Sequence, residues 1–244
     1  MVTYRIDVAY DGSGFHGFAR QRSVRTVQGE LEEALARVLQ SPVELTAAGR
    51  TDAGVHARRQ VVSFAAEREM DPRRIIRAVT SMLGPEVVAT AGAVVDDSFD
   101  ARFSATGRSY RYRILNGPFP DPLRRHTVWH VSAPLDLDRM NRAASHVVGE
   151  HDFASFCRRA EGRTTMRTVH EAEWNREGDL LVFAISAKAF CHQMVRSITG
   201  FCVDAGRGRV DPDSMPEVLA AEDRRAARNI APPTGLVLWD VSYD

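Results

Sequence analysis

Apolar residues in the first hundred positions recur either at every second residue or at every third to fourth. In YRIDVAYDG, positions 4–12, the alternation predicts a strand. Positions 27–40 and 72–83 have apolar residues at helical spacing, and each stretch follows a good N-cap, Thr26 or Asp71. Further strands are expected from Val43, from Gln60 to Glu67 and from Val87 to Val95. The predicted order of this half is therefore β-α-β-β-α-β.

The second half shows the same two periods in a similar order. RSYRYRI, positions 108–114, predicts a strand, and a helix is expected at 136–149 with Asp136 as its cap. Positions 167–190 predict a hairpin that turns near Glu177-Gly178. The remaining elements are helices at 191–206 and 215–227 and a final strand at 236–244.

This repeated order predicts an α+β fold built from two ferredoxin-like (βαββαβ) halves. We expect residues 1–103 to form the first domain and residues 104–244 the second. The two halves are expected to form one extended antiparallel sheet, because joining them edge to edge hides exposed strand edges. Helices would then cover one face of the sheet, and an active-site cleft would lie on the other.

Composition restricts the class of protein without identifying a partner. The 244 residues are 44% hydrophobic and 26% charged, which is ordinary for a soluble globular chain, and the formal net charge is zero. No apolar run reaches the roughly 20 residues of a membrane helix, and the N-terminus has no signal-peptide core, so we expect a cytoplasmic protein. Arginine supplies all but one of the 32 basic residues. Arginine clusters suit phosphates and stacked bases, although a codon preference explains much of the excess.

Cysteine usage favours a chain without structural disulfides. The three cysteines, Cys157, Cys191 and Cys202, include no CxxC pair. An odd number without such a motif argues against a disulfide framework and against a cysteine-built zinc site. We expect small buried hydrophobic side chains at all three positions.

The stretch AGRTDAGVHA, positions 48–57, places one carboxylate, Asp52, between two glycines. An aspartate before Ala-Gly is an ordinary turn residue. The alternative is chemistry, because Gly49 and Gly54 let the backbone approach a ligand closely and an ionised Asp52 in a tight loop is a credible nucleophile. Arg50 would either hold Asp52 ionised or grip a phosphate.

Arg196 has both a structural and a functional interpretation. On the expected helix 191–206, Arg196 shares a polar face with His192 and Thr199, opposite an apolar face. Arg196 is then either a solvated surface residue or a cation that crosses a cleft to pair with a carboxylate.

Tyr110 also has two interpretations. It shares strand parity with Tyr112 and Ile114, which is typical of a core aromatic. The functional alternative is that Tyr110 stacks on a base or uses its hydroxyl group in proton transfer.

Taken as a set, these stretches resemble the TruA family of tRNA pseudouridine synthases. The resemblance covers essentially the whole chain, and its segments occur in the correct order: YDGSGFHGFARQ, TVQGELEEAL, AGRTDAGVHA, FDARFSATGRSYRYRI, GEHDFASF, AFCHQMVRSITG and APPTGLVLWDV. Departures from the family pattern, such as Phe18 where many relatives have tryptophan, do not fall on Asp52, Tyr110 or Arg196.

The resemblance implies an isomerase that converts uridine to pseudouridine at positions 38, 39 and 40 of the tRNA anticodon stem-loop. It implies a homodimer that needs no cofactor and no metal. Asp52 is then the catalytic aspartate, acting as nucleophile or base. Tyr110 packs on the target base and is a candidate to remove the C5 proton, Arg196 pairs with Asp52, and Arg50 helps to extrude the nucleotide. Further RNA contacts are expected from Arg20, Gln21, Arg58 and His192.

Two other functions compete with this one. A non-catalytic RNA-binding protein on the same scaffold would keep the arginines without needing Asp52, and the intact candidate site argues against it. A metal hydrolase is suggested by His126 and His130, which stand four residues apart. However, the surrounding HTVWHV predicts a strand and lacks the glutamate of an HExxH motif.

Overall fold

The computed structural model describes residues 1–158, 162, 164–227 and 229–243. The chain divides into two compact units. Unit 1 contains Met1–Thr106 and Val237–Asp244, and unit 2 contains Gly107–Leu236. The expected second domain, 104–244, therefore differs from unit 2 at its C-terminal end, because the chain from Val237 onward belongs to unit 1.

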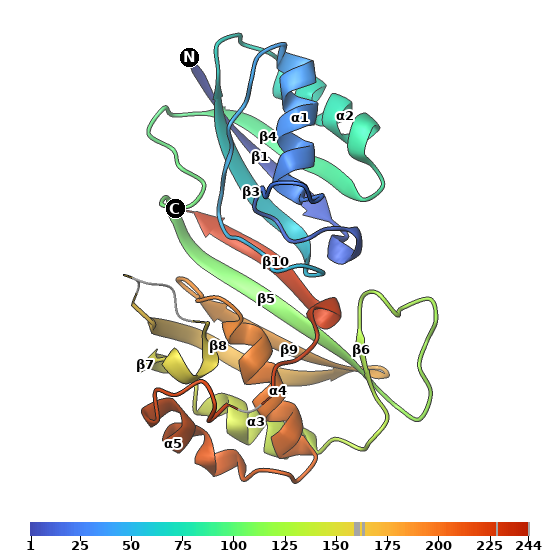
Figure 1. Ribbon diagram of the computed structural model, residues 1–244, viewed down its shortest axis with the longest axis vertical. Helices are drawn as coiled ribbons and strands as arrows, with labels where there is room; N and C mark the ends of the chain where they lie inside the picture. The colour runs from blue at the N-terminus through green and yellow to red at the C-terminus, as the bar shows by residue number, and fades with distance from the viewer. Residues whose placement is uncertain (159–161, 163, 228, 244) are drawn as a thin grey trace. The chain divides into compact units, whose positions relative to one another are not determined.

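Unit 1 follows the predicted β-α-β-β-α-β order (Figure 1). Its elements are β1 (Val2–Tyr10), α1 (Val27–Leu39), β2 (Thr46–Ala47), β3 (His56–Ala66), α2 (Pro72–Leu83) and β4 (Val87–Val95). The last strand of the chain, β10 (Leu236–Tyr243), joins this unit, and the strand order is β4-β1-β3-β10 with β2 also paired to β3. The pairing of β10 with β3 is parallel, whereas β1, β2 and β4 pair antiparallel.

Local capping explains where the helices of unit 1 begin. The side chain of Thr26 accepts a hydrogen bond from the Gly29 amide, and that of Asp71 accepts one from the Arg73 amide, as predicted. Figure 1 shows α1 and α2 together on one face of β1, β3 and β4. The predicted alternation along β1 buries Tyr4, Ile6 and Val8 completely or nearly so.

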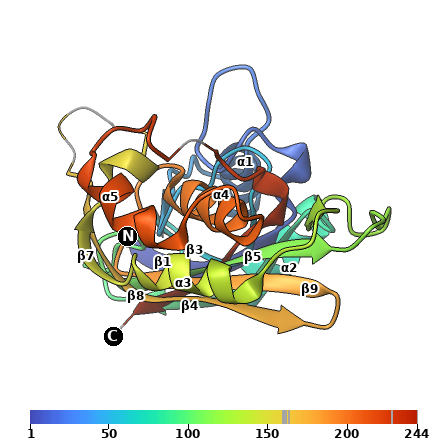
Figure 2. The same cartoon turned by 90° about the horizontal axis from the view of Figure 1, so that it is seen from below.

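Unit 2 contains strands β5 (Ala105–Asn116), β6 (Trp129–Val131), β7 (Gly149–Asp152), β8 (Met166–Glu177) and β9 (Leu180–Ala187). Its helices are α3 (Leu137–Ser145), α4 (Met194–Gly206) and α5 (Met215–Ala220). The strand order is β5-β9-β8-β7, with antiparallel pairing throughout this row, and β6 lies parallel to β5. Short 3₁₀ turns occupy Gly12–Gly14, Ala154–Phe156, Pro212–Ser214 and Pro233–Gly235. Figure 2 shows the same elements from below.

The predicted helices of unit 2 exist but are shorter than expected. Asp136 caps α3 as predicted, yet α3 ends at Ser145, and Gly149 begins the unpredicted strand β7 with a left-handed φ of 106°. Helix α4 begins only at Met194, because Gln193 has a left-handed backbone conformation. The hairpin of β8 and β9 is confirmed, as are the α+β class and the mostly antiparallel pairing of the strands.

The prediction for the cysteines is wrong for two of the three. Cys157 and Cys191 form a disulfide, with their Cα atoms 5.8 Å apart and 34 residues between them in sequence. Cys202 is a buried free cysteine, as expected. The pair was missed because no local motif links these cysteines, and only the folded chain brings their two segments together.

Candidate active site

Gln60 anchors the start of the loop that carries Asp52. Its side chain is fully buried, its Nε2 donates to the Gly49 carbonyl at 2.7 Å and its Oε1 accepts from the Gly49 amide at 3.3 Å. The amide of Ala48 also donates to the Val61 carbonyl at 2.9 Å. A buried amide side chain that satisfies both backbone groups of one residue leaves that residue little freedom. The backbone is therefore held in place three residues before Asp52.

Thr51 fixes the residue immediately before Asp52. Its hydroxyl oxygen lies 2.8 Å from the phenol oxygen of Tyr10, and its carbonyl accepts from the Phe18 amide at 3.0 Å. Burial raises the pKa of the Tyr10 phenol to about 12, and hydrogen bonds to Thr51 and Gln60 offset part of the rise. The phenol is consequently neutral at physiological pH and supports the loop as a hydrogen-bonding group.

Asp52 begins a tight turn, so its structural interpretation is correct as far as it goes. The amide of Val55 donates to the Asp52 carbonyl at 3.1 Å, and Gly54 supplies the left-handed φ of 78° that such a turn requires. The strand-end segment packs closely beneath the turn, since a Cβ on Gly12 would lie 2.0 Å from the Val55 carbonyl oxygen. The turn is thus supported from below by backbone atoms.

The Asp52 side chain is half-buried at this supported turn, and Arg50 is exposed. The two roles expected for Arg50, holding Asp52 ionised and gripping a phosphate, both stay predictions. Its exposure leaves the guanidinium accessible to a phosphate.

The other expected RNA contacts in unit 1 already have protein partners. Arg20 donates from Nη1 to Oε2 of the buried Glu32 at 2.8 Å, and Gln21 donates to the His16 carbonyl at 2.8 Å. The exposed Arg58 lies over the ring of Trp239, with 4.3 Å from its guanidinium carbon to the ring centroid. Stacking of this kind fixes the plane of a guanidinium while leaving its N–H groups available. RNA contact by these residues stays a prediction.

In unit 2, Arg196 is the one residue of α4 that is not buried. Its Nε donates to the Ala231 carbonyl at 2.8 Å, and the Ala231 amide donates back to the Arg196 carbonyl at 3.0 Å. The Nε bond fixes the direction of the side chain, and the backbone bond holds the segment around Ala231 against α4. Arg196 is therefore a positioned, partly accessible cation on an otherwise buried helix, which differs from the freely solvated arginine of the structural interpretation.

The polar helical face predicted around Arg196 is wrong. Thr199 is fully buried and donates from its hydroxyl to the Val195 carbonyl at 2.8 Å, so its polarity is satisfied inside the helix. His192 is exposed and precedes the first residue of α4. The helical projection failed because the left-handed Gln193 interrupts the helical path between His192 and Met194.

Tyr110 lies at the accessible end of an otherwise buried row on β5. Tyr112 and Ile114, on the same face of the strand, are fully buried, whereas Tyr110 is half-buried and packs edge-on against Phe190 at 5.1 Å between ring centroids. Burial raises the pKa of the Tyr112 phenol, and the positive charge of Arg196 offsets part of the rise. Tyr110 therefore shares a strand face with the core residues Tyr112 and Ile114, and its ring is still partly exposed.

The structure gives no support to the metal-hydrolase interpretation. His130 lies in strand β6, and its Nε2 is 2.8 Å from the Gly117 carbonyl oxygen. His126 lies in the turn that precedes β6, so the two histidines do not occupy one face of a helix as a motif with this spacing requires. Within the described ranges, no group of three or more His, Cys, Asp or Glu side chains is arranged to hold a metal ion.

Sequence reasoning missed Gln60 and Tyr10 as residues that support the loop. The available signal was a polar glutamine at the start of the apolar stretch QVVSF, where a lone amide in a strand core needs a buried partner. Asp52 belongs to unit 1, whereas Tyr110 and Arg196 belong to unit 2.

Comparison with known proteins identifies the family. The profile described as tRNA pseudouridine synthase matches residues 7–104 and 143–244. A Streptomyces griseus protein named tRNA pseudouridine synthase A is 44% identical over 254 residues, which cover 99% of this chain and 88% of its own. A Bacillus subtilis protein of the same name is 40% identical over 97% of both chains, and one from Methylococcus capsulatus is 42% identical over 98% of this chain and 88% of its own. The chain therefore belongs to the tRNA pseudouridine synthase family, whose members are isomerases.

Proposed function

We propose that this isomerase converts uridine to pseudouridine at positions 38, 39 and 40 of the tRNA anticodon stem-loop, with Asp52 as its catalytic carboxylate. The observation that carries the proposal is the support of the Asp52 loop. The backbone is held at Gly49, Thr51 and Val55, while the Asp52 side chain itself is only half-buried. A carboxylate held in advance reaches a reacting atom without reorganising the protein around it.

The reaction explains why one carboxylate is sufficient. The N1–C1′ bond breaks, the uracil turns, and a C5–C1′ bond forms, while C5 loses a proton and N1 gains one. Substrate and product are therefore isomers. No water molecule is activated, so the second acid of a glycosidase is not needed. Asp52 acts as nucleophile or base, and the chemistry needs no cofactor.

The remaining candidate residues serve binding and proton transfer in this proposal. Tyr110, with its ring held edge-on by Phe190, packs on the target base and removes the C5 proton. Arg196 pairs with Asp52, and its Nε bond to the Ala231 carbonyl supports a fixed orientation. The exposed Arg50 helps to extrude the nucleotide, which costs a few kcal/mol of unstacking. Arg20, Gln21, Arg58 and His192 contribute RNA contacts that offset this cost.

We also propose a cytoplasmic homodimer. None of the described helices is long and apolar enough to cross a lipid bilayer. A mass measurement in solution at micromolar concentration tests the dimer, and a monomer there would contradict it.

The proposed function is tested by tritium release from [5-³H]-uridine tRNA transcripts, with tRNA binding measured in parallel. The variants are Asp52→Asn and Asp96→Asn. Asp96 is a matched control, because it also begins a turn, in which its carbonyl accepts from the Phe99 amide at 2.9 Å. Transcripts in which uridine is replaced at positions 38, 39 or 40 locate the modified nucleotides.

We expect release by the wild type and by Asp96→Asn, and no release by Asp52→Asn although it still binds tRNA. Release by Asp52→Asn at the wild-type rate would remove Asp52 from the chemistry. Tight tRNA binding by a wild-type protein that releases no tritium would favour a non-catalytic RNA-binding protein. Release that persists after replacement of all three uridines would contradict the proposed positions.

A further inference from the structure

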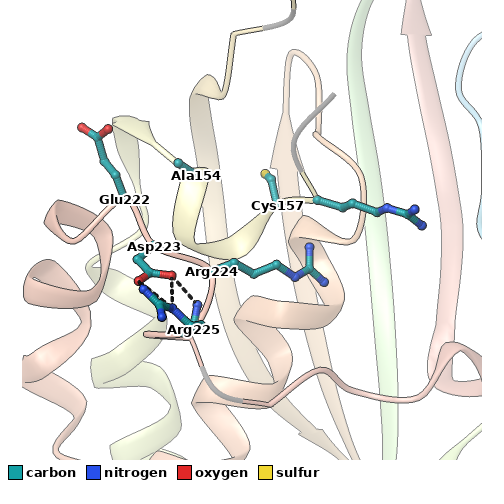
Figure 3. A pocket seen from close by; sticks show the side chains of 7 residues that line it. Ala154, Cys157, Glu222, Asp223, Arg224 and Arg225 are labelled. Atoms are coloured by element: carbon teal, nitrogen blue, oxygen red, sulfur yellow. Dashed lines mark hydrogen bonds and ion pairs between the residues drawn. The ribbon is translucent and has the colours of Figure 1, made fainter. Parts of the chain in front are cut away.

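Unit 2 contains a cavity of about 350 Å³ that none of the candidate active-site residues lines (Figure 3). It is lined on one side by Ala154, Cys157 and Arg158, which belong to the segment around the second 3₁₀ turn. The other side is the loop that follows α5, residues 222–225. Three of the seven lining residues are arginines.

Both walls of the cavity are attached to the three residues that precede α4. The amide of Arg158 donates to the His192 carbonyl at 3.0 Å, and Cys157 is joined to Cys191 by the disulfide. Arg224 donates from its guanidinium to the Gln193 side-chain oxygen. The two arginine-bearing segments are therefore held at one place in the unit, although they lie far apart in sequence.

The charges of the cavity are unequally compensated. Arg225 is neutralised by Asp223, to which its Nε donates at 3.0 and 3.1 Å, and these hydrogen bonds to the Asp223 carboxylate raise the pKa of Arg225. Arg224 has the neutral amide of Gln193 as its partner, and Figure 3 shows its side chain extending away from Asp223 and Glu222. Across the part of the chain that is described, neither Arg158 nor Arg224 forms an ion pair with a carboxylate.

We propose that Arg158 and Arg224 form a binding site for the phosphodiester backbone of the tRNA substrate. Two exposed guanidinium groups without a carboxylate partner match the charge and the hydrogen-bonding geometry of phosphate oxygens. The site adjoins the segment that leads into α4, the helix that carries Arg196. Contacts between these arginines and the phosphates of the tRNA would position the substrate and add salt-dependent affinity. Such contacts do not depend on the base sequence of the tRNA. The proposal rests on tRNA being the substrate, as proposed above.

The test measures the dissociation constant for an unmodified tRNA transcript between 50 and 200 mM KCl, together with tritium release. The variants are Arg158→Gln, Arg224→Gln, the double variant, and Arg224→Lys. Arg176→Gln is the matched control, because Arg176 is exposed in the same unit near the far end of β8. The cavity lies near the other end of β8. Asp152, two residues before the lining residue Ala154, pairs there with Met166, the first residue of β8.

We expect each glutamine variant to weaken binding several-fold and to lower the salt slope by about 0.7–0.9 per lost phosphate contact. The double variant lowers the slope by roughly twice as much, and KM rises while kcat at saturating tRNA is nearly unchanged. Arg176→Gln keeps the wild-type slope. Arg224→Lys retains most of the slope because it keeps the charge.

Three results would overturn the inference. One is an unchanged salt slope in the double variant, and another is an equal loss in Arg176→Gln. The third is a loss in Arg224→Lys as large as that in Arg224→Gln, which would assign Arg224 to holding Gln193. Failure of the wild type to bind tRNA or to release tritium would instead contradict the proposed function, so the two failures are distinguishable.

Discussion

The phenol oxygen of Tyr10 lies 2.8 Å from the hydroxyl oxygen of Thr51, the residue immediately before Asp52. Both side chains are buried, with 5% of Tyr10 and 7% of Thr51 exposed. Removing one partner of a hydrogen bond between buried hydroxyls leaves the other hydroxyl buried and unsatisfied, which costs folding free energy. The end of β1 is in this way coupled to the backbone of the Asp52 turn.

The first prediction concerns Tyr10→Phe. This change removes one hydroxyl group and leaves the buried Thr51 hydroxyl without that partner, so we expect the free energy of unfolding to fall by about 1–3 kcal/mol. We also expect kcat for tritium release to fall more than KM changes, because the turn loses a support close to Asp52. Urea denaturation and steady-state kinetics measure the two effects.

Tyr4→Phe is the matched control for this prediction. Tyr4 also lies on β1 and is fully buried, but its hydroxyl donates to the Met70 carbonyl at 3.0 Å and accepts from the Met70 amide at 2.7 Å. We expect a similar loss of stability and an unchanged kcat. Equal kcat values for Tyr10→Phe and Tyr4→Phe would show that the Tyr10 hydroxyl has no role beyond stability.

The second prediction concerns alkaline pH. The folded pKa of Tyr10 is about 12, above its usual value of about 10, so folding favours the neutral phenol. The resulting stabilisation is fully present below pH 10 and is lost as the pH rises from 10 towards 12. The free energy of unfolding of the wild type should therefore fall by about 2 kcal/mol more than that of Tyr10→Phe between pH 9 and 11.5. Parallel urea curves for the two proteins over this range would contradict the assignment.

The third prediction concerns Gly12→Ala. A Cβ at position 12 would lie 2.0 Å from the Val55 carbonyl oxygen, so the Asp52 turn or the end of β1 must move. We expect a loss of at least about 2 kcal/mol of stability together with a loss of activity. Gly117→Ala is the control, since its Cβ would meet nothing within 4 Å, and its effect should stay within about 0.5 kcal/mol. Calorimetry and tritium release are measured on both variants. Unchanged stability and activity in Gly12→Ala would refute the close packing of Gly12 against Val55.

The fourth prediction concerns the disulfide between Cys157 and Cys191. Closing a loop of this length stabilises the folded chain by roughly 2–4 kcal/mol, so reductant should lower the free energy of unfolding by that amount. Thiol titration of the denatured protein should find one free thiol before reduction and three after it. Because reductants break disulfides, as the thiol systems of the cytoplasm do, the titration uses protein purified without reductant. A count of three thiols in that sample would contradict the disulfide, and Cys202→Ala should keep the response to reductant.

Local features of the fold were predictable from the sequence because each depends on a few neighbouring residues. The caps Thr26, Asp71 and Asp136 were all identified correctly, since a short polar side chain before an apolar periodic stretch satisfies amides within the next turn. The hairpin at Glu177-Gly178 was also identified correctly. For the same reason the turn interpretation of Asp52 is confirmed, whereas its chemical role stays a prediction.

Features that depend on distant segments were not predictable in this way. The role of Gln60 requires Gly49 to lie beside β3, and the disulfide requires two segments to meet that are 34 residues apart. Thr199 was misassigned to a polar face because its hydroxyl is satisfied by its own helix, which allows it to be fully buried. In each case the outcome depends on tertiary packing, which outweighs the local pattern.

The return of β10 to unit 1 has a consequence for synthesis on the ribosome. The ribosome makes Met1–Thr106 first, then all of Gly107–Leu236, and only then the residues of β10 that pair with His56 and Ala57 of β3. During translation the edge of β3 next to the Asp52 loop lacks this partner until the whole of unit 2 has emerged. Completion of the nascent fold of unit 1 is therefore delayed until after unit 2 has been made, and chains that stall before Val237 should expose that edge to chaperones.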